Sequence, residues 1–233
     1  MYINSIERPQ SLTEIAADRL RTAITEGTFS MGQPLSENML ANLFNISKTP
    51  IKQALTELRN EGLVVIVPQK GTYVFTATPE DLHQMTELRE ALEVKGLHCA
   101  FARNRKKLVS DLDYIYKHML RTREEGDTLE YLRLDALFHQ SIMTLSANEY
   151  LLAAYKLIAV KARAMLFHLS DRPLERKEHF EEHGLIMESL KKGDVETAAA
   201  VLRKHVYRHS HIDFSRLDDV SLHNEPLAAD RIR

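Results

Sequence analysis

Four side chains with metal-binding chemistry lie in the second half of this 233-residue chain. Asp135 and His139 are four residues apart, so a helix would place both on one face. His183 and His205 lie in two later segments with apolar helical patterns. Three imidazoles and one carboxylate meeting between three helices would bind a divalent ion: histidine suits Zn²⁺ or Ni²⁺, and the carboxylate also admits Mn²⁺. The pattern predicts such a site, with positions left open for water or a ligand carboxylate.

Histidines at these spacings also have a simpler interpretation. The chain contains 11 histidines, so one within four residues of an aspartate is expected by chance. A buried histidine can be a hydrogen-bonded part of the core and bind nothing else. His179 and His209 each lie four residues from a predicted ligand and could take its place. Spacing alone leaves a metal site and a structural cluster both open.

A second group of polar side chains has the chemistry of DNA recognition. These residues would lie at the exposed N-terminal end of one predicted helix: Ser47, Lys48, Thr49, Lys52 and Gln53. Lysine can pair with phosphates or with guanine acceptors, and glutamine can bond both groups of an adenine edge. The alternative is an ordinary amphipathic helix with a solvated polar face. The elements around this helix decide between the two.

The segment from residue 35 to residue 62 predicts two short helices joined by a tight turn. Ser36 is placed to cap the first helix, and Asn45, which tolerates positive φ, falls at the turn. The first helix would bury Leu40 and Leu43 among other apolar residues. Gly62 then ends the second helix.

A hairpin and an upstream helix complete this predicted module. Two β-rich runs, Leu63–Val67 and Thr72–Phe75, flank a tip where Gln69 and Lys70 could touch the DNA backbone or minor groove. Residues 11–27 read as an amphipathic helix. This order of elements predicts a winged helix-turn-helix, whose second motif helix enters the DNA major groove.

The remainder of the chain predicts an antiparallel bundle of six to seven helices. Capping residues, glycines and prolines place helices at residues 79–103, 106–125, 127–146, 148–169, 173–192 and 194–217. The expected organisation is a DNA-binding domain at 1–76, an all-helical domain at 79–217 and a flexible tail at 218–233.

Composition restricts the class of protein. The formal net charge is −2, and the first 78 residues carry as many acidic as basic side chains, so DNA binding depends on where the basic residues lie. The single cysteine, Cys99, fits a reducing compartment. We find neither a signal peptide nor an apolar run of membrane-spanning length. These features predict a cytoplasmic protein.

The run ISKTPIKQALTELRNEGLV, followed by PQKGTYV, resembles the GntR superfamily of bacterial transcription regulators. The resemblance implies DNA contacts from Asn38, Lys48, Thr49 and Lys52, and from the wing residues Gln69, Lys70 and Gly71. Arginine is usual at the positions of Lys48 and Lys52. Lysine keeps the charge but lacks the bidentate fork, so contact with phosphate should survive while strict guanine readout stays open.

The helical part resembles the FCD effector domain of the FadR-like branch of this superfamily. The matching pieces are D-A-L-F-H at 135–139, E-E-H-G-L-I at 181–186, K-K-G-D at 191–194 and R-K-H at 203–205. In metal-binding members an Asp and a His four apart join two later histidines. The resemblance implies these metal ligands here: Asp135, His139, His183 and His205.

Arg89 matches an arginine that commonly faces the effector in these regulators. An ion pair with Glu90 or Glu93 is the alternative role for this side chain. A metal together with Arg89 would form a positive pocket in a low-dielectric interior, which selects a small carboxylic or hydroxy acid.

We therefore predict a ligand-responsive transcription regulator, not an enzyme. Acid binding would change how the bundle holds two DNA-binding modules, and so change affinity for operator DNA. The homodimer is expected from the family and from operator symmetry. Two alternatives remain: a dedicated metal sensor, and a metal-dependent hydrolase or lyase. Against a hydrolase or lyase, the sequence shows no recognisable nucleophile motif or HExxH-type helix.

Overall fold

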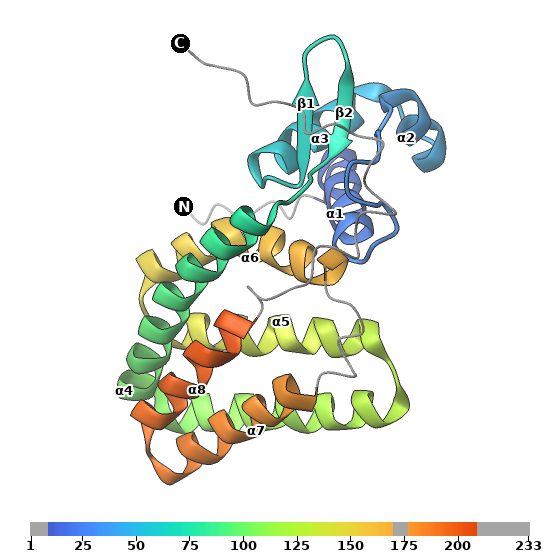
Figure 1. Cartoon of the computed structure of the whole chain (residues 1–233). Coiled ribbons are helices and arrows are strands. Elements are labelled where there is room, and N and C mark those ends of the chain that lie inside the picture. The colour runs from blue at the N-terminus through green and yellow to red at the C-terminus, as the bar shows by residue number, and fades with distance from the viewer. Residues whose placement is uncertain (1–8, 170–176, 209–233) are drawn as a thin grey trace, which may run out of the picture. The chain divides into compact units, whose positions relative to one another are not determined.

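The computed structural model describes residues 9–169 and 177–208, whose helices and strands are labelled in Figure 1. The chain divides into two compact units, residues 1–76 and residues 77–233. Buried apolar side chains form a core in each unit. None of the described helices combines the length and apolar character needed to cross a membrane.

The described part of the N-terminal unit consists of three helices followed by a hairpin. In chain order these are α1 (Leu12–Thr25), α2 (Glu37–Phe44), α3 (Lys48–Asn60), β1 (Val64–Val67) and β2 (Gly71–Val74). The strands pair antiparallel, with Val64 opposite Val74 and Val67 opposite Gly71. This is the predicted winged helix-turn-helix.

Local sequence signals set the ends of these helices. Ser11 and Glu14 form a reciprocal capping box at the start of α1, and Ser36 caps α2. Asn45 has the predicted left-handed conformation, with φ 54° and ψ 46°. Leu43 differs from the prediction, because α2 is short and reaches the core mainly through Leu40 and Ala41; Leu43 is 63% exposed.

The C-terminal unit is helical throughout its described residues. Its helices are α4 (Pro79–Glu125), α5 (Thr128–Leu145), α6 (Glu149–Leu169), α7 (Lys177–Lys192) and α8 (Val195–Arg208). α4 packs against each of the other four, so it is the central scaffold of the bundle (Figure 1). The predicted continuation of the last helix to residue 217 and the predicted tail at 218–233 lie outside the described residues.

The predicted break between two helices near residue 104 is a kink inside α4. Asn104 has non-helical angles, φ −137° and ψ 32°. Its Nδ2 donates to Leu145 O at 2.8 Å, and Arg103 Nη1 donates to Ser146 O at 2.8 Å. These bonds satisfy carbonyls at the C-terminal end of α5, which have no partner within their own helix. The kink therefore fixes α5 against α4.

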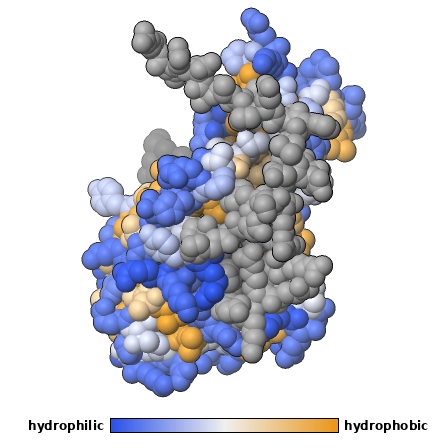
Figure 2. Space-filling view, in the orientation of Figure 1, coloured by the Kyte–Doolittle hydropathy of each residue, from blue (hydrophilic) through white to orange (hydrophobic). Residues whose placement is uncertain are grey.

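A glycine lets α4 and α5 approach closely. A Cβ atom added at Gly96 would lie 2.5 Å from Met143 Sδ. The coloured surface of the C-terminal unit in Figure 2 is mainly hydrophilic, with small scattered apolar patches. The structure thus confirms a mostly helical fold, with a winged helix-turn-helix followed by a helical bundle.

Candidate metal centre and nucleic-acid interface

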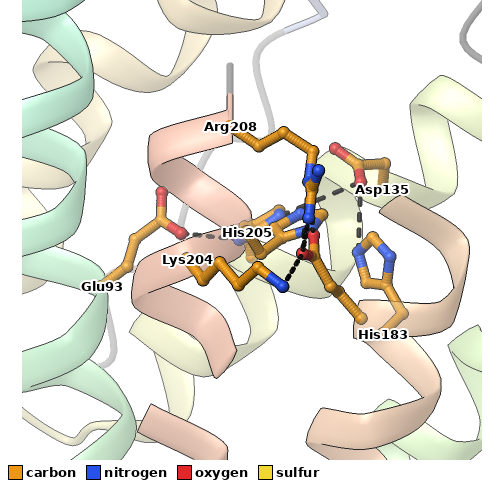
Figure 3. Close-up of polar contacts among 8 residues, drawn as sticks. Glu93, Asp135, His183, Lys204, His205 and Arg208 are labelled. Carbon is orange, nitrogen blue, oxygen red and sulfur yellow. Dashed lines mark hydrogen bonds and ion pairs between the residues drawn. The ribbon is translucent and has the colours of Figure 1, made fainter. Parts of the chain in front are cut away.

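Three helices of the bundle bring the four predicted metal ligands together. α5 contributes Asp135 and His139, α7 contributes His183, and α8 contributes His205. One potential ligand atom from each lies within 4.8 Å of the others. The three imidazoles are almost completely buried, and Figure 3 shows Asp135, His183 and His205 directed toward one another.

The cluster fits a divalent ion. Asp135 Oδ1 lies 3.2 Å from His183 Nε2 and 3.9 Å from His139 Nε2. Ligands on opposite sides of an ion with bonds of about 2.1 Å are about 4.2 Å apart, so small side-chain rotations would close the widest separation. Three nitrogens and one carboxylate oxygen suit Zn²⁺, Ni²⁺ or Mn²⁺. The side chain of His179 and all of His209, the alternative ligands, lie outside the described residues.

Two buried glutamates lie next to the Nδ1 atoms of two of the clustered histidines. Glu93 Oε2 lies 2.6 Å from His139 Nδ1, and Glu182 Oε2 lies 3.3 Å from His205 Nδ1. A carboxylate next to Nδ1 favours the proton there and leaves Nε2 as the electron-pair donor, the arrangement usual behind metal-binding histidines. Glu93 Oε2 and His139 Nδ1 form a close ion pair whose atoms are not aligned as a hydrogen bond. Both glutamates are essentially inaccessible to solvent. A structural histidine would need an Nδ1 partner as well, so the stronger support for a metal is His139 Nε2, which is buried and has no hydrogen-bond partner in the described part of the chain.

Arg89 and Glu93 form a buried ion pair beside the cluster. Arg89 Nε donates to Glu93 Oε1 at 2.7 Å, and both side chains are at most 5% exposed. Burial alone would raise the pKa of Glu93, but the charges of Arg89 and His139 outweigh it and lower that pKa to about 2. Burial likewise opposes ionisation of Asp135, yet a hydrogen bond from His183 and the histidine charges keep its pKa well below the ordinary range. Both carboxylates are therefore ionised at neutral pH.

The structure clarifies which acid pairs with Arg89. Of the two candidates, Glu93 makes the contact, whereas Glu90 accepts from Arg203 Nε at 2.6 Å. The terminal nitrogens of Arg89 make no hydrogen bond or ion pair within the described part of the chain. The pair and a role in effector binding are compatible, since the guanidinium has four further N–H donors.

Tyr155 of α6 adds a buried hydroxyl to this region. Burial, and then the negative charge of Glu93, raise the pKa of its phenol, so the group stays neutral at physiological pH. Sequence reasoning missed Tyr155, which carries no distinguishing pattern within α6. It also missed the roles of Glu93 and Glu182 behind the histidines. The spacing of Glu93 from Arg89 was a usable signal, but the contact from Glu182 to His205 is a tertiary one.

The predicted DNA-contacting residues lie on the surface of the N-terminal unit. Lys48, Thr49 and Lys52 are exposed along the first turns of α3, and Asn38 is exposed on α2. Ser47 is the N-cap residue of α3, and its side chain makes no capping hydrogen bond there. Together they give α3 an exposed N-terminal end with two basic side chains.

Gln53 and the wing have more specific contacts. Gln53 is exposed, but its Oε1 accepts from Thr13 Oγ1 at 2.8 Å, which ties α3 to α1. At the hairpin tip Gln69 and Lys70 are exposed, and Gln69 and Gly71 have φ of 64° and 126°. A φ of 126° strains any residue with a side chain, so Gly71 is suited to the turn by its conformation. The structure places the wing tip on the surface, as predicted.

Comparisons with known families agree with this architecture. Residues 12–74 match the family described as bacterial regulatory proteins, gntR family, and residues 84–208 match the FCD domain. An HTH-type transcriptional regulator from an unstable DNA locus of Streptomyces ambofaciens, described as uncharacterized, is 30% identical over 192 residues, covering 81% of this chain and 79% of that protein. The gluconate operon transcriptional repressor of Bacillus licheniformis is 29% identical over 183 residues, 76% of this chain and 75% of that one.

Solved structures show the same fold. Escherichia coli McbR/YncC is 22% identical, with a TM-score of 0.74 over 86% of this chain and 95% of that chain. A GntR regulator from Rhodococcus sp. RHA1 also has a TM-score of 0.74, at 21% identity, over 86% and 96% of the two chains. The matched families and relatives are regulators and not enzymes, which sets aside the hydrolase or lyase alternative. This chain belongs to the GntR family of bacterial transcription regulators and carries an FCD domain after its DNA-binding domain.

Proposed function

We propose that this regulator binds operator DNA as a homodimer in the cytoplasm, and that a small organic acid bound at a metal-containing pocket changes its affinity for DNA. Residues 1–76 would bind DNA, and residues 79–217 would hold the metal and the acid. The observation that carries the proposal is the buried cluster of three histidines and Asp135 next to the Arg89–Glu93 ion pair.

The charges around the cluster explain why an anion would need the metal. Arg89 and Glu93 neutralise each other, so Asp135 leaves a net negative charge when the histidines are neutral. A divalent ion at the cluster reverses the sign of that charge. Because charges in a buried, low-dielectric site interact strongly, the loaded pocket would attract a carboxylate.

The chemistry of the site favours a carboxylate or hydroxy acid. When bound, the ion would supply a Lewis-acidic centre with coordination positions beyond the four protein ligands. The terminal nitrogens of Arg89 and the neutral hydroxyl of Tyr155 would orient the rest of the anion. One relative is named as the repressor of a gluconate operon, and gluconate is a hydroxy acid. That name supports the chemical class by analogy and does not identify the effector.

The surface of the N-terminal unit supports the DNA side of the proposal. Lys48 and Lys52 would pair with phosphates or guanine, while Asn38, Ser47, Thr49 and Gln53 would add hydrogen bonds. The wing residues Gln69, Lys70 and Gly71 would approach the adjacent backbone or minor groove. Two such modules in a homodimer would read two half-sites.

The test compares metal-free and metal-loaded protein. After chelation, protein reloaded with Zn²⁺, Ni²⁺ or Mn²⁺ is screened by thermal shift against a panel of carboxylates and hydroxy acids. Any stabilising acid is then added to fluorescence-anisotropy titrations with a duplex selected from a random library. We expect acids to stabilise only loaded protein and to shift DNA affinity about 5- to 150-fold, the usual range of allosteric coupling. Equal stabilisation of metal-free protein would contradict a metal-dependent pocket.

A dedicated metal sensor is the second candidate. The pairing of Arg89 with Glu93 favours it, since that pair leaves the metal as the main uncompensated positive charge. In this case metal alone would shift DNA affinity by the full amount, and no acid in the panel would change it further. Titrating metal against DNA affinity without any acid distinguishes the two functions.

A further inference from the structure

Glu93 connects the cationic side chain of the proposed anion site to a ligand of the proposed metal site. Its two oxygens have different partners: Oε1 accepts from Arg89 Nε at 2.7 Å, and Oε2 lies 2.6 Å from His139 Nδ1. Glu93 is completely buried, so water does not compete for these contacts. Figure 3 shows Glu93 reaching from α4 toward the cluster.

Metal binding and anion binding would both act on this shared carboxylate. A metal ion on His139 Nε2 withdraws electron density from the ring and makes the Nδ1 proton a stronger donor to Glu93. An anion that pairs with Arg89 weakens the hold of the guanidinium on the same carboxylate, which leaves more of its charge for His139. Either event therefore strengthens the contact between Glu93 and His139, and the metal holds more tightly to a better-oriented histidine.

We infer that Glu93 is a positioning residue that couples the two ligands, so that anion binding tightens metal binding and metal binding tightens anion binding. This inference rests on the proposed function, because it requires a carboxylate to bind next to the metal. Reciprocity of the two effects follows from thermodynamic linkage.

Glu182 provides a matched control within the same protein. It also lies behind a metal ligand, with Oε2 at 3.3 Å from His205 Nδ1. Its other contacts are with Arg208 at 2.6 Å and Lys204 at 3.8 Å, both on α8 and both partly exposed. Neither of these is the arginine of the anion site. Loss of Glu182 should weaken the metal site without cutting the connection to Arg89.

The experiment measures Zn²⁺ affinity by competition with a chromophoric chelator, in acetate and in chloride at equal ionic strength. Wild type should bind Zn²⁺ about 5-fold or more tightly in acetate, the lower end of typical allosteric coupling. Glu93→Gln and Glu182→Gln should each lose about 10- to 100-fold in metal affinity, as is usual when an outer partner of a ligand is removed. Only Glu182→Gln should keep the acetate effect.

Glu93→Gln leaves the buried Arg89 without its counter-ion, so a second variant is needed in case that protein does not fold. Glu93→Asp keeps the charge but shortens the side chain by one methylene, so it cannot span both partners. It too should lose the acetate effect. Full coupling in Glu93→Asp, or in folded Glu93→Gln, would overturn the inference.

An independent measurement separates this inference from the proposed function. Mn²⁺-loaded wild type should broaden the ¹³C resonances of labelled acetate, because a carboxylate next to a paramagnetic ion relaxes quickly. Absence of broadening would refute the anion site and, with it, the coupling. Broadening together with equal acetate effects in the two glutamine variants would refute only the role of Glu93.

Discussion

Replacing Asp135 with asparagine removes one charge from the metal cluster with almost no change in size. Asp135 Oδ1 lies close to Nε2 of both His183 and His139, at 3.2 and 3.9 Å. A neutral carbonyl is a poorer ligand than a carboxylate for a divalent ion. Loss of an outer partner costs roughly 10- to 100-fold in metal affinity, so loss of a direct ligand should cost at least about 100-fold.

This loss can be converted into a change in stability. A 100-fold decrease in affinity corresponds to about 2.7 kcal/mol, at about 1.4 kcal/mol for each factor of ten. When metal is well above the Kd of both proteins, all of that energy appears as a difference in stability. A chain of this length changes its melting temperature by about 2–4 °C per kcal/mol, so loaded Asp135→Asn should melt about 5–11 °C below wild type.

Thermal melts followed by circular dichroism, in Zn²⁺ and in chelator, provide the measurement. In chelator the difference should shrink to about 1 kcal/mol or less, because asparagine still accepts a hydrogen bond from His183. Asp113→Asn is the matched control: it removes the same charge from surface pairs with Lys117 and Lys191, and should act equally with and without metal. An equally large loss for Asp135→Asn in both buffers would show that Asp135 stabilises the fold and not an ion.

Four further substitutions test other parts of the molecule. Lys48→Ala or Lys52→Ala should weaken operator binding by about 1–3 kcal/mol and reduce the salt slope by about one, measured by fluorescence anisotropy; unchanged affinity in both would exclude the predicted role of α3. In Gly96→Ala the new methyl group would displace the Met143 side chain, at about 1–3 kcal/mol, while alanine adds about 1 kcal/mol of helix propensity, so urea titrations should show a net loss of up to about 2 kcal/mol. A gain in stability would mean that Met143 repacks without cost. Arg89→Ala should abolish the response of DNA binding to acid while retaining DNA binding without acid, and a response at the wild-type concentration would place the anion elsewhere.

Residue types and local pattern predict much of this structure. The capping residue Ser36, the left-handed turn at Asn45 and the interruption of α4 at Asn104 are all local features, and each was readable in the sequence. Helical spacing also placed Asp135 and His139 on one face. Bringing His183 and His205 to that face required the arrangement of the whole bundle, which the family resemblance supplied.

The sequence pattern could not predict contacts between elements that are distant in the chain. Glu182 precedes His183 in the sequence, yet it contacts His205 on another helix because α7 and α8 pack side by side. Gln53 looks like a free recognition residue, but a hydrogen bond from Thr13 ties it to α1. Leu43 shows the same limitation, since periodicity gives the direction of a side chain but not the extent of the core beneath it.

Under the proposed function, the acid sensor and the metal sensor are two limits of one coupled equilibrium. The ion would supply positive charge that an acid can bind, so acid binding depends on the ion, and by linkage the acid tightens ion binding by the same factor. The ligand whose concentration in the cell varies around its own Kd is then the signal. The other ligand stays bound throughout and acts as a fixed component of the protein. Wild-type metal affinity, measured with and without acid, therefore gives the size of the coupling. If the protein binds metal equally tightly with and without acid, the ion and the acid bind independently and the charge argument is wrong.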